Sequence, residues 1–123
     1  MTDIGAHIGL LDDPSFNFYD GNYSGNIPKR LSPDLYLPVP HDIHSRIWAL
    51  IRDGADNARQ LDWGAVGVIC TRQQLLDFMG SLHEGQLPHI KQVIKEAKKY
   101  IRKLDPDTKY VLVAYETGLD YGD

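Results

Sequence analysis

The predicted centre of the fold is the stretch Tyr110-Val111-Leu112-Val113-Ala114-Tyr115. Nearly every side chain in this stretch is apolar, which is typical of an inner strand whose two faces are both covered. A second short apolar run, Ala65-Val66-Gly67-Val68-Ile69-Cys70, predicts another β-strand. We therefore expect the other segments of the chain to pack around a small β-sheet.

Three amphipathic helices are predicted from apolar side chains spaced three and four residues apart. They are expected over residues 42–53, from Thr71 to Gly85, and from Pro88 to Leu104. Thr71 and Gln74 form a capping box, in which each side chain satisfies a backbone amide at the start of the second helix. The pattern predicts an α+β fold, with three helices packed on a small sheet.

The first forty residues are expected to form irregular structure and short strands, because they hold five of the seven prolines. Phe16-Asn17-Phe18-Tyr19 alternates apolar and polar side chains before Asp20-Gly21, which predicts a short hairpin. Leu35, Leu37 and Val39 alternate between prolines and predict an edge strand or an extended segment. We expect one domain over residues 1–123, with an irregular part at 1–40 and a regular α+β core at 41–123.

The composition is that of an ordinary globular domain. The chain has 123 residues, of which 42% are hydrophobic and 24% are charged. Cys70 is the single cysteine, so an internal disulfide is excluded. Neither a basic leader nor eighteen consecutive apolar residues are present, and we expect a cytoplasmic protein without a membrane partner.

The charge is unevenly distributed. The net charge is −4, yet residues 91–103 carry six basic side chains against the single acid Glu96. Four cations follow one side of the third helix: Lys91, Lys95, Lys98 and Arg102. Such a stripe is usually solvated surface, but it can also dock on an acidic protein or bind nucleic acid. The acidic remainder is suited to a basic partner.

No motif in the sequence indicates catalysis or a cofactor. His41 and His44 could supply two metal ligands from a helix start, but His83-Glu84 and His89 offer no third ligand at a recognised spacing. The glycine-containing loop at 20–26 lacks both the phosphate-loop ending and the calcium-loop pattern. We expect no catalytic residue, metal or cofactor, although carboxylates brought together from distant positions leave no local pattern.

Aromatic residues among small polar ones mark a candidate partner-binding surface. In the N-terminal region these candidates are Phe18, Tyr19, Asn22 and Tyr23. Trp63, just ahead of a strand, either anchors its loop, which is the favoured interpretation, or contacts a partner. The candidate binding residues are thus these five together with the four cations of the basic helix.

Three motifs carry a resemblance to known proteins: Asp62-Trp63-Gly64, then Thr71 with Gln74-Leu75, and finally Tyr110 to Glu116. Together they resemble small uncharacterised α+β domains of bacterial and phage genomes, over about half of the chain. No activity is attached to these domains. The resemblance implies a small protein that binds another macromolecule, as immunity proteins, antitoxins and inhibitors do.

The leading functional hypothesis is a non-enzymatic protein-binding inhibitor of the immunity-protein, antitoxin or phage anti-defence type. Its expected partner is another protein, such as a toxin or a defence protein. One alternative is a small-ligand or nucleotide-binding protein, or an enzyme, that uses the Tyr/Gly loop. A second alternative is nucleic-acid binding through the basic helix at 88–104. Self-association through the edge at 35–39 is also open.

Overall fold

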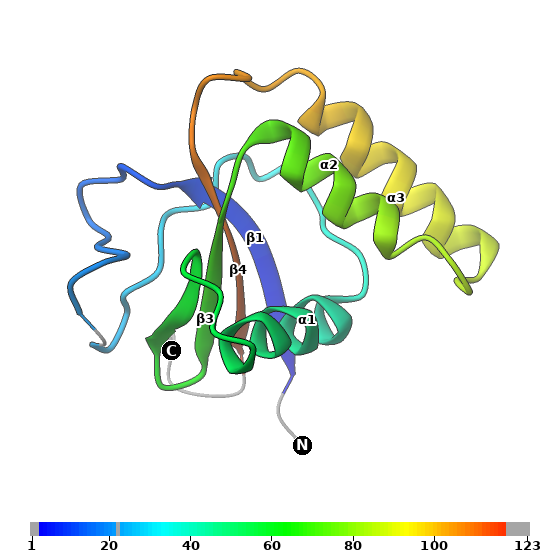
Figure 1. Cartoon of the computed structure of the whole chain (residues 1–123). Helices are drawn as coiled ribbons and strands as arrows, with labels where there is room; N and C mark the ends of the chain where they lie inside the picture. The colour runs from blue at the N-terminus through cyan, green and yellow to red at the C-terminus, as the bar shows by residue number, and fades with distance from the viewer. Residues whose placement is uncertain (1–2, 22, 118–123) are drawn as a thin grey trace.

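The computed structural model describes residues 3–21 and 23–117 and confirms the α+β class. Along the chain the elements are β1 (Ile4–Leu10), α1 (Pro40–Arg52), β2 (Ala58–Asp62), β3 (Ala65–Cys70), α2 (Arg72–Ser81), α3 (Pro88–Ile101) and β4 (Tyr110–Glu116) (Figure 1). Within the described ranges, none of the helices is long and apolar enough to cross a membrane.

The four strands form one antiparallel sheet in the order β1-β4-β3-β2. β4 is paired on both sides, since Val113 lies opposite His7 of β1 and Gly67 of β3. The sequence prediction of an inner strand at 110–115 is therefore confirmed. Because side chains alternate along a strand, each strand contributes to two different faces of the sheet.

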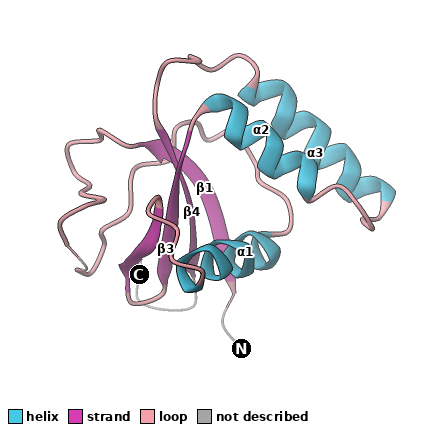
Figure 2. Ribbon diagram, in the orientation of Figure 1, coloured by secondary structure: helices cyan, strands magenta, loops and turns pink. Residues whose placement is uncertain are grey.

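One face, which we call the helix face, packs against the three helices (Figure 2). Leu112 of β4 is completely buried there, and α1 contacts all four strands. α2 and α3 pack against each other as a pair. The buried apolar residues that the helices bring to this face are Ile43, Ile47, Leu75, Met79, Ile94, Ala97 and Ile101.

The opposite face, which we call the loop face, is covered by residues 11–21 and 23–30, here named the covering loop. Figure 1 shows this segment on the side of the sheet away from α2 and α3. Its close approach to β1 requires glycine, because a Cβ on Gly9 would lie 2.6 Å from the Pro28 side chain. The buried cluster on this face comprises Phe16, Phe18, Leu61, Ala65, Val111 and Val113.

The start of α2 is held as its capping box predicts. The Gln74 amide donates to Thr71 Oγ1 at 3.2 Å, and the Thr71 amide donates to Gln74 Oε1 at 2.9 Å. The predicted helix end at Gly85 is too late, since α2 ends at Ser81. α3 likewise ends at Ile101, where Arg72 of α2 donates to the carbonyls of Arg102 and Leu104.

The hairpin predicted around Asp20-Gly21 is wrong for the described residues of that segment. No strand forms at 16–21, because the Asn17 side chain accepts hydrogen bonds from the amides of Tyr19 and Asp20. Such side-chain bonds compete with strand pairing for the backbone donors. The chain turns locally at Asn17 as a result.

Of the two alternatives predicted for 35–39, an edge strand or an extended segment, the edge strand does not form. Val39 adopts a left-handed conformation with φ 42° as the N-cap of α1, which interrupts the extended path. Pro38 and Pro40 lack the amide hydrogens that a ladder needs. The segment packs Leu35 into the helix-face core, so it offers no strand edge for the predicted self-pairing.

Two strands were not predicted. β1 lies within the region expected to form irregular structure and short strands, but no strand was predicted at 4–10, so the regular structure begins at Ile4 and not near residue 41. Its period-two signal was the alternation of Ile4, Ala6, Ile8 and Leu10 with smaller or polar residues. β2 has little apolar signal, because Arg59 and Gln60 stand in its middle.

Candidate functional site

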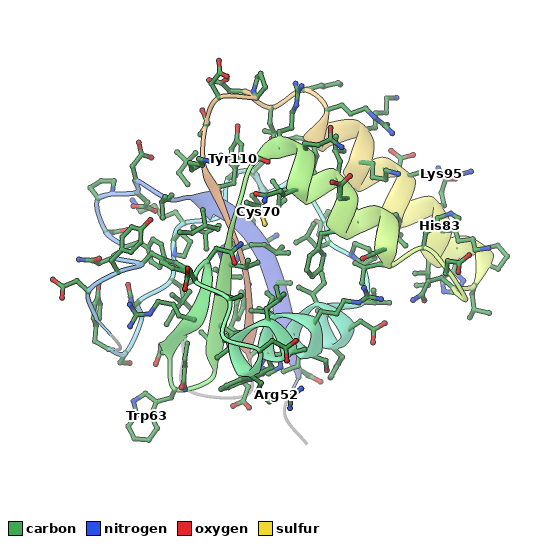
Figure 3. All side chains as sticks on the ribbon, viewed as in Figure 1. Arg52, Trp63, Cys70, His83, Lys95 and Tyr110 are labelled. Atoms are coloured by element: carbon green, nitrogen blue, oxygen red, sulfur yellow. The ribbon has the colours of Figure 1, made fainter. Side chains whose placement is uncertain are left out.

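Trp63 stands at the turn between β2 and β3, and 83% of its surface is exposed. Figure 3 shows its indole pointing away from the ribbon at the end of this hairpin. The preferred sequence interpretation, that Trp63 anchors its loop, is therefore wrong. The Gln60 side chain donates to the Trp63 carbonyl at 3.2 Å, which leaves the backbone fixed and the ring free.

Asp62 is the residue that anchors this turn. It is only 1% exposed, and its carboxylate accepts hydrogen bonds from the Trp63 amide and from the Gly25 amide, the latter at 2.7 Å. A register shift between Gln60 and Asp62 marks a bulge, a feature that commonly re-aims side chains. Asp62 thus turns inward where Trp63 turns outward, and it ties the covering loop to the hairpin turn.

The covering loop exposes two tyrosines. Tyr19 is 70% exposed and Tyr23 is 45% exposed. Phe18, which the sequence grouped with them, is 2% exposed and packs on the loop face, so its assignment as a contact residue is wrong. Its ring still meets that of Tyr19 edge to face at 5.4 Å and supports it from below. Asn22 lies outside the described residues.

Asn26 organises the backbone that carries these tyrosines. Its fully buried side chain accepts from the Asn17 amide and donates to the carbonyls of Asn17 and Gly21, each at 3.0 Å. Asn17 in turn accepts from the Tyr19 amide at 3.1 Å. The backbone that carries these tyrosines is therefore held in a hydrogen-bonded turn.

Asp13 joins the two ends of the covering loop. Its carboxylate accepts from the Lys29 amide at 2.8 Å and from the amide and hydroxyl of Ser15 at 2.9 and 2.7 Å. The Lys29 amide bond, followed by the Ser15 bonds, lowers the pKa of the Asp13 carboxyl. Hydrogen bonds to the charged form favour ionisation, so Asp13 holds the loop as a carboxylate.

His7 of β1 connects the covering loop to the sheet. Its Nε2 lies 2.7 Å from the Pro28 carbonyl and its Nδ1 lies 3.0 Å from the Tyr115 hydroxyl. Burial lowers the pKa of His7, against the hydrogen bond to Pro28, which raises it. The neutral ring that donates from Nε2 to Pro28 can accept the Tyr115 proton at Nδ1, and both contacts are satisfied.

The basic helix does not join the aromatic residues in one surface. Lys95 and Arg102 are exposed, whereas Lys91 and Lys98 are half-buried. The Lys98 ammonium lies over α2, 3.7 Å from where a Cβ on Gly80 would stand. Figure 3 places Lys95 and Trp63 at opposite ends of the molecule. Trp63 and the basic helix therefore lie on separate parts of the molecule.

The histidines near α1 form no metal centre. His44 packs edge to face against Trp48 at 6.4 Å, and burial lowers its pKa, while the nearby Glu116 acts to raise it. Among residues 3–21 and 23–117, no three His, Cys, Asp or Glu side chains are grouped to hold a metal ion. Cys70 is buried, which raises its pKa to about 12 and keeps it a thiol at neutral pH.

No family model, curated protein or solved structure matches this chain. The resemblance to bacterial and phage domains therefore stays a prediction. The functional interpretation depends on the geometry of the chain itself.

Proposed function

We propose that this chain is a non-enzymatic protein-binding domain that contacts its partner through Trp63, Tyr19 and Tyr23. The observation that carries the proposal is the 83% exposure of Trp63 directly beside the buried anchor Asp62. A freely exposed indole loses favourable burial unless something covers it. We call these three residues the aromatic surface.

The chemistry of the aromatic surface suits a protein partner. Tryptophan and tyrosine are the residue types that most often carry the binding energy of protein interfaces. Their large rings gain contact area with few rotatable bonds, and the anchors Asn26 and Asp62 fix the backbone below them. This combination supports tight binding from a small contact area.

The charge around the aromatic surface favours a basic partner. The covering loop contains the acids Asp12, Asp13 and Asp20 against Lys29 and Arg30, and the chain outside 91–103 has sixteen acids against seven basic residues. Complementary charge raises the association rate and rejects acidic competitors. A small acidic protein that blocks a basic nuclease or a similar toxin or defence protein fits this description. The finer assignment to an immunity protein, antitoxin or phage anti-defence inhibitor belongs to the same proposal.

A nucleotide site in the Tyr/Gly loop is less well supported. A phosphate-binding loop needs free backbone amides that point at the ligand. Here the amides of Tyr19 and Asp20 donate to Asn17, the Gly25 amide donates to Asp62, and the Asn26 amide donates to the Tyr23 carbonyl. These donors are used within the protein, which favours a binding surface made of side chains.

The proposal is tested by comparing captured proteins on three baits: the unmutated chain, Trp63→Ala and Tyr36→Ala. Tyr36 is 71% exposed but lies outside the aromatic surface, so it is the matched aromatic control. We expect one partner to be retained by the unmutated chain and by Tyr36→Ala and to be lost from Trp63→Ala. With purified partner, Trp63→Ala should weaken binding by roughly 30-fold, which corresponds to about 2 kcal/mol.

The captured protein should also lose its own activity on addition of the unmutated chain and keep it on addition of Trp63→Ala. Retention that is equal on all three baits would contradict the proposal. If the partner binds but keeps its own activity, the assignment as an inhibitor is wrong, and only the proposal of a protein-binding surface stands.

A further inference from the structure

A groove of about 500 Å³ lies between residues 34–36 and α3, apart from the aromatic surface. Its apolar floor includes Leu35 and Ala97, both almost fully buried, with Val93 beside them. This size is within the range of sites that accept a ligand the size of a nucleotide.

Two tyrosines line the groove from different parts of the chain. Tyr36 comes from the extended segment before α1 and is 71% exposed, and Tyr100 comes from α3 and is half-buried. From sequence alone the basic helix had only Tyr100 as an aromatic neighbour. The fold supplies the second ring across the groove, and aromatic rings interleaved with cations are typical of single-strand binding.

Two exposed lysines, Lys99 and Lys103, line the same groove. They are four residues apart, at the C-terminal end of α3 and just beyond it, so they lie on one side of the chain. The stripe of Lys91, Lys95, Lys98 and Arg102 does not line the groove, although Lys95 stands one helical turn before Lys99. The charge of the groove lining itself is balanced, with Lys99 and Lys103 against Asp34 and Glu96, and the other basic residues of 91–103 add the positive field that favours an anion.

We propose that this groove binds one nucleotide of a single-stranded nucleic acid, with its base against Tyr36 and Tyr100 and its phosphate held by Lys99 and Lys103. A base paired within a duplex cannot offer its face to the tyrosines, so the site selects single strands. An acidic peptide satisfies the lysines but leaves the two aromatic faces unused. The groove also contains the acids Asp34 and Glu96, which weaken phosphate binding and keep the affinity moderate.

The first experiment measures fluorescence anisotropy of short labelled single-stranded RNA and DNA, the matching duplex, adenosine monophosphate and a glutamate-rich peptide. We expect single strands to bind at low salt, with a slope of log K against log salt of about −0.7 for the one phosphate that Lys99 and Lys103 hold. Duplex and peptide should bind at least 10-fold more weakly. Absence of single-strand binding at low salt, or equal binding of duplex or peptide, overturns the proposal. If adenosine monophosphate binds as tightly as the oligonucleotide, the proposal of a single-stranded ligand is overturned, and the groove is a site for a free nucleotide.

The second experiment compares matched single substitutions in the otherwise unmutated chain. Tyr36→Ala should weaken single-strand binding at least about 5-fold through lost stacking, while Tyr36→Phe should retain it. Lys99→Gln should make the salt slope shallower than Lys95→Gln does, since Lys95→Gln is an equal charge change one helical turn earlier at a side chain that does not line the groove. Glu96→Gln should tighten binding. The groove is overturned if Tyr36→Ala binds normally or if Lys95→Gln and Lys99→Gln act alike.

This inference is independent of the protein-binding proposal. Trp63→Ala, which should abolish partner capture, should leave oligonucleotide binding unchanged. Tyr36→Ala should weaken oligonucleotide binding and leave partner capture unchanged. The failure of one proposal is thus distinguishable from the failure of the other.

Discussion

The two faces of the sheet are built in different ways. On the helix face, regularly spaced apolar side chains such as Ile47 and Ile94 belong to one buried cluster with Leu112. On the loop face, a segment without helix or strand is held by polar residues, of which Asp13, Asn26 and Asp62 are the buried examples. Every buried side-chain polar atom of the described residues has a hydrogen-bond partner, so these anchors are fully used.

The difference teaches where exposed aromatic residues can be placed. A helix that packs its apolar stripe inward exposes mainly charged and polar residues, as α3 does. The covering loop needs only a few anchors inward, which leaves Tyr19 and Tyr23 free to face outward. The aromatic surface is therefore a product of the loop face, whereas the groove beside α3 is a product of the helix face.

The largest effect is expected from a matched pair of leucines, one on each face. Leu112 and Leu61 are both 0% exposed, and Leu→Ala typically costs about 2–5 kcal/mol. We expect Leu112→Ala near the upper end of this range, because α1, which packs against β4, is a rigid helix that cannot move inward to close the cavity. Leu61→Ala should cost about 2–3 kcal/mol, because the covering loop can move inward.

Urea unfolding of both variants measures this difference. Equal costs would show that the covering loop is as rigid as the helices, which would break the comparison between the two faces.

A smaller effect is expected from Asn26→Ala. It leaves the Asn17 amide and the carbonyls of Asn17 and Gly21 without their side-chain partner, at a cost of about 1–2 kcal/mol. Hydrogen exchange should accelerate at 17–21 while α1 to α3 remain protected. Asn57→Ala is the control, since that side chain makes one bond, to Ile69 of β3. Faster exchange throughout the sheet in Asn26→Ala would show that the two faces unfold as one unit.

The helix face could be predicted because its signals are local. The capping box joins Thr71 and Gln74, three residues apart, and Pro88 marks the first residue of α3. The sheet centre was found in the same way, from consecutive apolar residues in β4. β1 and β2 were missed because glycines dilute the alternation in the first and polar residues interrupt the second.

The loop face could not be predicted because its bonds join residues that are distant in sequence. Asp62 reaches Gly25 across 37 positions, and Asp13 reaches Lys29 across 16. Nothing in the sequence indicates which aspartate will be buried, since an isolated acid is usually exposed. Trp63 was misjudged for the same reason, because the inward anchor of its turn is its neighbour Asp62.

The smallest effect is a pH dependence at His7, which tests how firmly the covering loop holds to the sheet. Its folded pKa lies below the ordinary 6.5, so the unfolded chain binds the proton more readily. The contribution of His7 is fully present above pH 6.5 and is lost as the pH falls toward the lowered folded pKa. Protonation leaves the Nε2 donation to Pro28 in place and makes Nδ1 a donor to the Tyr115 hydroxyl, so the cost is that of burying a charge.

The measurement is urea unfolding on both sides of pH 6.5 for the unmutated chain and His7→Gln. His44 has a lowered pKa too, and it contributes with the same sign in both proteins. The difference between the two pH slopes therefore isolates His7, and we expect a shallower slope in His7→Gln. Identical slopes would show that His7 is protonated without cost in the folded state, and that the contact between Pro28 and β1 does not depend on a neutral ring.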